Sequence, residues 1–359
     1  MNKERSSNFE LFRIILMLVI IAHHYVVNSG VTKFLNPQHL NGEMIFLQFW
    51  GMGGKIAIDC FLLITGYFMI RGGWRFRKAI ELYAEIKFYK IIIFLILGVG
   101  IYQQVNFFTI SHCVFSTLYS IGYGRSFPEV FLLFYLFIPF INKMLYSLPK
   151  REWIWLLTLL ISFYSVLYTC IPSLNQKSIH YLGWFITLYI IGAYIRTYPN
   201  KYTESQNFGL YNSLCAFVFI LCSILLLDFA KYANILNLSG NYYYYFSMDS
   251  NKLGALWLSV SLFLWVKSCK LNYNKYINWA AKSTLGILLI HANSDLMRRF
   301  LWGDLLNVVG VYRYHSEWIV LHALLSVVGV YGICLILDKG REYLFLKCEY
   351  MLKRHFNKG

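Results

Sequence analysis

The sequence is poor in charged residues and especially poor in acidic ones. Only 14% of its 359 residues are Asp, Glu, Lys or Arg, and 17 acidic residues stand against 33 basic ones, for a formal net charge of +16. Hydrophobic residues make up 58% of the chain and aromatic residues 19%. This composition, with a positive mean hydropathy of +0.50, excludes an ordinary soluble surface. The chain is predicted to be a polytopic membrane protein.

Several signatures of soluble enzymes are also missing. The eight cysteines contain no CxxC pair and most lie in apolar runs, so they are interpreted as buried thiols. The chain has no zinc-ligand spacing, no glycine fingerprint for nucleotides and no fixed-period repeat. We therefore expect no bound metal and no chemistry driven by ATP. Because no polar linker divides the sequence, residues 1–359 are predicted to form one membrane domain without an additional soluble domain.

Long apolar runs predict the architecture. A helix of about 20 apolar residues spans a bilayer, and such runs predict an all-α transmembrane bundle of about ten spans. The expected spans are 9–29, 54–70, 84–102, 128–147, 153–172, 179–197, 211–230, 252–268, 277–294 and 316–337. The first run resembles a signal-peptide core, but it contains two histidines and lacks a small-residue cleavage site, so it is expected to remain as the first span.

The basic residues test this topology, because the cytoplasmic ends of spans should carry most of them. With the N-terminus inside, 24 of the 33 Lys and Arg residues fall on the inner flanks. The asymmetry predicts an even number of spans with both termini in the cytoplasm. Because the cations lie at helix ends and form no basic domain, anionic lipids explain them better than nucleic acid does.

One arginine and two histidines interrupt the first apolar run. Arg13 and His24 are eleven residues apart, a spacing that returns to nearly the same helix face about 16 Å further on. Polar groups are costly in lipid and usually face a protein interior or a wet cavity, so this stripe is hypothesised to be functional. Each residue alone has an ordinary explanation, as a headgroup-seeking arginine or a hydrogen-bonded histidine. His23 points about 100° away and is the less favoured actor.

The second expected span carries an acid near its outer end. Asp59 is a candidate to orient His24 or to raise its basicity. A structural salt bridge to Lys55, one turn earlier, is the equal alternative.

Four cations follow the second span within eight positions: Arg71, Arg75, Arg77 and Lys78. Guanidinium groups bind phosphate oxygens in bidentate fashion, so this cluster is a candidate clamp for a nucleotide-bearing donor such as a coenzyme A thioester. Orientation by the positive-inside rule is the competing explanation.

Polar residues on the outer side are candidates to bind an acceptor. His291 and Asn293 lie at the outer end of the ninth expected span, and Glu129 lies near the start of the fourth. Segments positioned by a rigid scaffold often carry binding function. Interface anchoring is the alternative, and it also explains most tyrosines of the NYYYYF run at 241–246, for which sugar stacking is a second interpretation.

Taken in order, these segments resemble the integral-membrane acyltransferase family three, whose members O-acylate polysaccharides, lipopolysaccharides and related glycans. NFELFRIILMLVIIAHH is similar to the family's first helix and GKIAIDCFLLITGYFMI to its second-helix signature. VFLLFYLFIPFIN, YLGWFITLYIIGAYIR and STLGILLIHAN follow in the family's order. The resemblance implies that His24 acts with Arg13 in acyl transfer and that the basic segment after the second helix meets a cytoplasmic donor. Where relatives often have two arginines three apart, this chain has Arg75 and Lys78, and lysine loses the bidentate fork.

Together these features predict a bacterial inner-membrane O-acyltransferase, most simply an O-acetyltransferase using acetyl-CoA. The donor's phosphates are expected to lie on Arg13 and the Arg71 to Lys78 cluster, with the thioester reaching along the bundle toward His24. His24 is expected to take the proton from a hydroxyl of an extracytoplasmic or lipid-linked glycan, and a covalent acyl-histidine is the alternative. A transporter or flippase for a glycan intermediate is the competing function, and a scaffold in a polysaccharide-synthesis complex is a third. The expected partners are acyl-CoA, the saccharide acceptor and membrane lipids, without nucleic acid, and a homo-oligomer is compatible with the sequence.

Overall fold

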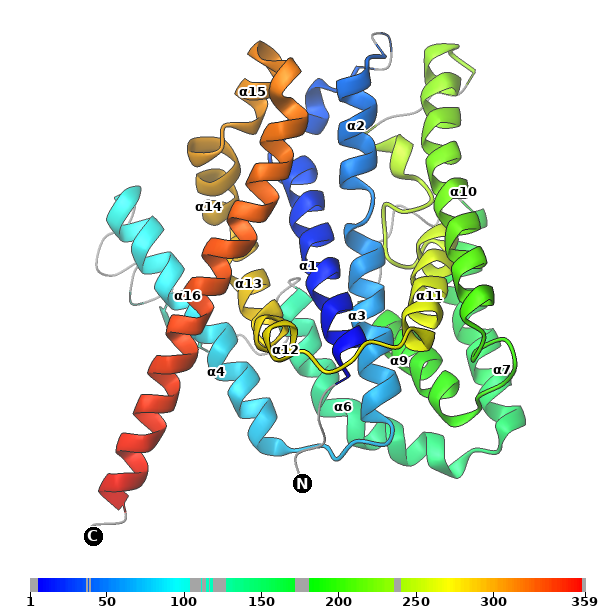
Figure 1. Ribbon diagram of the computed structural model, residues 1–359, viewed down its shortest axis with the longest axis vertical. Coiled ribbons are helices and arrows are strands. Elements are labelled where there is room, and N and C mark those ends of the chain that lie inside the picture. Colours follow the sequence, from blue (N-terminus) through cyan, green and yellow to red (C-terminus); the bar gives the residue numbers. More distant parts are fainter. Residues whose placement is uncertain are drawn as a thin grey trace.

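The computed structural model describes residues 6–36, 38, 40–103, 111, 114–115, 117–118, 127–171, 181–235 and 240–356. The structure is 82% helix, without strands in the described part of the chain. This confirms the predicted all-α class. The N-terminal end of α1 and the C-terminal end of α16 point toward the same end of the bundle (Figure 1).

The α-helices and π-helices run in chain order as follows: α1 Ser7–Val27, α2 Gly42–Gly51, α3 Gly54–Met69, α4 Phe76–Ile93, η3 Phe94–Ile101, α6 Phe127–Ser147, α7 Lys150–Ile161, η4 Ser162–Val166, α8 Leu167–Cys170, α9 Tyr181–Thr197, α10 Gln206–Tyr232, α11 Leu253–Ser268, α12 Lys275–Ala281, α13 Thr284–His291, α14 Asp295–Arg298, η7 Arg299–Leu305, α15 Val308–Tyr314 and α16 Ile319–Phe356. Short 3₁₀ turns are η1 Val31–Phe34, η6 Tyr242–Tyr244 and η8 Ser316–Trp318.

Six helical stretches within the described residues are long and apolar enough to cross a membrane: Ser7–Val27, Gly42–Met69, Phe127–Ser147, Lys150–Cys170, Gln206–Tyr232 and Ser316–Met351. The other four expected spans also fall on helices, but these helices are shorter, more polar or interrupted. α9 has 17 residues and α11 has 16, while the ninth expected span is divided between α12 and α13. The number of membrane crossings therefore stays a prediction.

The first helix lies in the middle of the bundle (Figure 1), in contact with α2, α3, α12, α13 and α16. Glycines at the start of α3 permit this close packing. A Cβ at Gly53 would overlap the side chain of Val19, and a Cβ at Gly54 would overlap the ring of His23. Small residues at these positions let the backbone of α3 approach α1 directly.

The backbones of α3 and α9 also touch through glycines. A Cβ at Gly66 would overlap the carbonyl oxygen of Tyr189, and a Cβ at Gly192 would overlap that of Leu63. Since backbone atoms cannot rotate away, Gly66→Ala is expected to destabilise the protein by about 1–3 kcal/mol. The shift in thermal unfolding temperature of the purified protein measures this effect. Gly329→Ala on α16, where a Cβ meets nothing within 4 Å, is the control and should leave the temperature unchanged or slightly raised. An unchanged temperature for Gly66→Ala would contradict the packing argument.

The last helix continues 19 residues beyond the expected end of the tenth span, to Phe356. Its 38 residues correspond to about 57 Å. The added part runs beside α4 and is held there by two ion pairs, Arg341 to Glu85 at 3.1 Å and Arg77 to Glu349 at 2.9 Å. The apolar pattern marks only the part of a helix that can lie in lipid, and the charged residues after residue 337 are themselves good helix formers.

Two lysines that the sequence places on an inner flank share a buried carboxylate partner. Lys87 and Lys90 of α4 both form ion pairs with Glu129 of α6, and Lys87 Nζ is 3.6 Å from Glu129 Oε1. The side chains of Lys87 and Glu129 are 4% and 2% exposed. A buried carboxylate offsets the charge that a lysine carries into a bundle.

Candidate functional site

Two histidines meet where α1 and α13 pack together. Nδ1 of His24 lies 3.0 Å from Nε2 of His291, and the ring centroids are 5.2 Å apart. His291 is the last residue of α13 and is completely buried. His24 lies in the last turn of α1, where its carbonyl accepts a hydrogen bond from the amide of Asn28 at 2.9 Å. The imidazole of His24 therefore faces the protein interior.

The position of α13 depends on a close contact with α16. A Cβ at Gly286 would overlap the carboxylate of Asp338, so glycine lets these helices approach. Asp338 is buried and accepts hydrogen bonds from Tyr89 at 2.8 Å and Arg341 at 2.9 Å. The beginning of the helix that presents His291 is thus packed against a fixed, hydrogen-bonded side chain.

The second nitrogen of His291 assigns the tautomers of both rings. Its Nδ1 lies 2.6 Å from the carbonyl oxygen of Ile287. A carbonyl only accepts hydrogen bonds, so Nδ1 of His291 carries the proton. Nε2 of the neutral His291 ring is then an acceptor, and His24 donates to it from Nδ1. Nε2 of the neutral His24 ring is left unprotonated, with the lone pair that a general base needs.

Arg13 lies two turns into α1 and forms an ion pair with Glu10, one turn earlier, at 3.0 Å. The side chains are 26% and 5% exposed. Since α1 is continuous from Ser7 to Val27, Arg13 and His24 are separated by about 16 Å along the helix. The pair with Glu10 holds the guanidinium near the N-terminal end of α1.

The structure gives Asp59 a different partner from either of the two expected. Asp59 of α3 is fully buried and accepts a hydrogen bond from Nε1 of Trp184 at 3.2 Å. Lys55 approaches Tyr181, with Nζ 3.4 Å from the hydroxyl. Both contacts are made to α9, and among the described residues neither side chain belongs to an ion pair within 4.0 Å. The side chain hydrogen-bonded to His24 is His291, whereas the hydrogen bond of Asp59 links α3 to α9.

The four cations after α3 are all exposed: Arg71, Arg75, Arg77 and Lys78. Arg77 is already engaged by two carboxylates, Glu81 at 2.8 Å and Glu349 at 2.9 Å. The backbone carbonyl of Arg75 accepts a hydrogen bond from Tyr135 at 3.5 Å. The cluster thus lies on a surface at the start of α4, and part of its charge connects α4 to α16.

The expected acceptor-binding residues have different partners in the structure. Glu129 is buried with Lys87 and Lys90, as described above. The side-chain amide of Asn293 donates to the carbonyl of Leu289 at 2.9 Å. Of the three, His291 is brought against His24.

The tyrosine run after α10 is a packing element. Tyr243 and Tyr244 are 2% and 3% exposed, so their rings are unavailable to a sugar. Tyr242 donates to the carboxylate of Asp228 on α10 at 2.8 Å, and Tyr245 donates to the carbonyl of Thr169 on α8 at 2.7 Å. The run therefore connects α8 and α10, and sugar stacking by Tyr243 and Tyr244 is ruled out.

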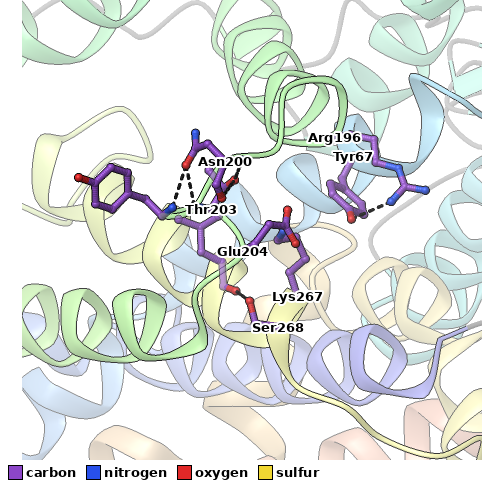
Figure 2. A network of polar contacts seen from close by, with 9 residues as sticks. Tyr67, Arg196, Asn200, Thr203, Glu204, Lys267 and Ser268 are labelled. Carbon is purple, nitrogen blue, oxygen red and sulfur yellow. Dashed lines mark hydrogen bonds and ion pairs between the residues drawn. The ribbon is translucent and has the colours of Figure 1, made fainter.

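A cavity of about 400 Å³ lies at the N-terminal end of α1, between the C-terminal ends of α3, α9 and α11. Sequence reasoning missed it. The side chains that line it include three cations and three aromatic rings, namely Arg196, Lys267, Lys270, Phe9, Tyr67 and Phe68. Figure 2 shows Arg196 beside Tyr67, and Lys267 beside the turn that carries Glu204. The only signal in the sequence is that each cation follows an apolar run.

Comparison with known proteins gives one match. The profile of a protein family, described as an acyltransferase domain, matches residues 6–339, which is nearly the whole chain. No curated protein and no solved structure matches the chain.

Proposed function

Because the chain belongs to the acyltransferase 3 family, we propose that it transfers an acyl group, most simply acetyl, from acyl-CoA to a hydroxyl of a glycan or lipid-linked saccharide. Membership of the family makes it an acyltransferase with apolar helices suited to a multi-pass membrane protein. The observation that carries the proposal is the His24–His291 pair, which leaves Nε2 of the neutral His24 ring unprotonated.

The pair supplies what acyl transfer to a hydroxyl requires. Nε2 of His24 takes the acceptor proton while the hydroxyl oxygen attacks the thioester carbonyl and forms the new C–O bond. The C–S bond then breaks, and the proton passes from His24 to the departing thiolate. While His24 is protonated, its Nδ1–H still donates to His291, so the ring keeps its orientation throughout. General-base help of this kind is worth about 10² to 10⁴ in rate.

We also propose the topology that the sequence predicts, with about ten spans and both termini in the cytoplasm of a bacterial cell. The even count is consistent with the common direction of the α1 start and the α16 end in Figure 1. In this orientation His24 lies toward the extracytoplasmic face, where a saccharide acceptor arrives, and the cavity at the start of α1 lies at the cytoplasmic face.

The test uses the full-length protein purified into lipid nanodiscs. With acetyl-CoA and a membrane glycan fraction, we expect release of free thiol that depends on the acceptor, together with a gain of one acetyl mass on the glycan. Movement of a lipid-linked saccharide across proteoliposomes without acyl-CoA, and without any thiol release, would overturn the proposal in favour of a transporter.

A further inference from the structure

The cavity at the N-terminal end of α1 contains a cluster of aromatic rings. Phe68 of α3 is 41% exposed and lines the cavity. Its ring is held edge-on by Phe9 at 5.0 Å and by Tyr67 at 5.3 Å between centroids. An exposed ring whose position is fixed by edge contacts is a stacking surface for a flat, aromatic ligand.

Three cations surround these rings. Arg196 lies over the face of Tyr67, 4.8 Å from its centroid, and donates to its hydroxyl at 2.9 Å. Lys267, whose side chain is 4% exposed, is paired with Glu204 at 2.5 Å. Lys270 lies on the exposed rim. With one carboxylate against three cations, these groups together present net positive charge to the cavity.

Arg196 is far from the two lysines in the sequence, and only the fold brings the three cations together. Arg196 lies in the last turn of α9, and Lys267 and Lys270 lie at the end of α11 and just after it. Both helices end beside the first turn of α1. The helix that carries His24 therefore begins at the wall of the cavity. From Phe9 to His24 the separation along α1 is about 22 Å.

We propose that this cavity binds the nucleotide part of the acyl donor, with an adenine-type base against Phe68 and phosphate groups against Arg196 and Lys270. This assignment rests on the proposed acyl-CoA-dependent function. The volume falls within the range of about 300–1,000 Å³ typical of small-molecule sites. A phospholipid headgroup shares the phosphate chemistry, but it has no flat ring for the aromatic surface. The fork of an arginine next to a stacking ring therefore favours a nucleotide.

Direct binding tests the assignment without turnover. Full-length protein in nanodiscs of neutral lipid is titrated calorimetrically with coenzyme A, adenosine 3′,5′-bisphosphate and pantetheine. We expect coenzyme A and the bisphosphate to bind and pantetheine to bind far more weakly. Lys270→Gln and Arg196→Gln should each weaken binding of the bisphosphate about tenfold, and Phe68→Leu should weaken it at least fivefold.

The variants differ in how much they disturb folding, so a variant that leaves the packing intact can decide the test. Arg196→Gln removes a contact with Tyr67, whereas Lys270→Gln changes an exposed side chain on the rim, so the latter is the primary variant. Lys275→Gln is the matched control, because this exposed lysine of α12 does not line the cavity. It should bind the bisphosphate as the parent does.

Four results would overturn the assignment. If Arg71→Gln weakens coenzyme A binding and Lys270→Gln does not, the donor is held at the start of α4. If Lys270→Gln removes only a thermal stabilisation by phosphatidylglycerol and leaves nucleotide binding intact, the cavity is a headgroup site. If the parent binds coenzyme A but no cavity variant changes its affinity, this inference fails alone. A parent that binds no coenzyme A overturns the proposed function as well.

Discussion

Purified His24→Ala is expected to transfer no measurable acetyl group, although it expresses and inserts into membranes like the parent. The imidazole of His24 in the parent supplies the unprotonated nitrogen that accepts the proton of the hydroxyl, and removal of a general base costs about 10² to 10⁴ in rate. Alanine leaves the apolar contacts of α1 largely in place, since this helix packs through other residues such as Leu16, Ile20 and Ile21. The rate is measured as acceptor-dependent thiol release and as acetyl mass on the glycan.

A second histidine provides the control for this variant. His315 is exposed, with its ring nitrogen 3.9 Å from the carboxylate of Glu317. His315→Gln should keep the parental rate. Acetylation at the parental rate by His24→Ala would remove His24 from the mechanism. If His24 is instead a nucleophile, the parent incubated with acetyl-CoA alone should yield an acetylated peptide containing residue 24.

The membrane helices were the easiest part of the fold to predict. A span is a local property, because about 20 consecutive apolar residues suffice to recognise it. α1, α6, α10 and the first part of α16 follow the expected ranges within a few residues. The interrupted segments were harder, since short runs such as α11, or the break between α12 and α13, depend on packing against neighbours.

Within the candidate site, the relation between Arg13 and His24 was predictable because both residues belong to one helix with a fixed period. The partners of Arg13 and His24 could be predicted only in part from the sequence. Glu10 is three residues from Arg13, a spacing that allows a helical ion pair. His291 is 267 residues from His24, and the sequence could indicate only that both lie at the outer ends of spans.

Buried charges account for most of the differences between sequence and structure. Lys87 and Lys90 were assigned to a flank because a lysine ordinarily ends a span, and the sequence did not reveal that both pair with Glu129. Asp59 has Trp184 as its partner, a neutral donor that no charge pattern identifies. In each case the deciding group lies on a different helix, so its position depends on tertiary packing and not on local spacing.

His291→Leu is expected to lower the turnover number by about a hundredfold or more while leaving the Michaelis constant for acetyl-CoA within about twofold. Leucine cannot accept the hydrogen bond from Nδ1 of His24, so the ring loses the partner that fixes its tautomer and orientation. A histidine held in the wrong tautomer presents a proton where the lone pair is needed, and in a Ser-His-Asp triad such a change costs about 10⁴ in rate. The measurement is steady-state kinetics of the purified variant with both substrates varied.

A structural role for His291 is separated from this positioning role by a conservative variant. The side-chain carbonyl of glutamine accepts a hydrogen bond as Nε2 of His291 does. The turnover number of His291→Gln should therefore be at least tenfold higher than that of His291→Leu. Both variants remove the bond from Nδ1 of His291 to the Ile287 carbonyl and should therefore lower the unfolding temperature by similar amounts. Recovery of activity without recovery of stability shows that His291 acts through His24. If turnover in both variants follows only the unfolding temperature, His291 serves to pack α13 and the tautomer argument fails.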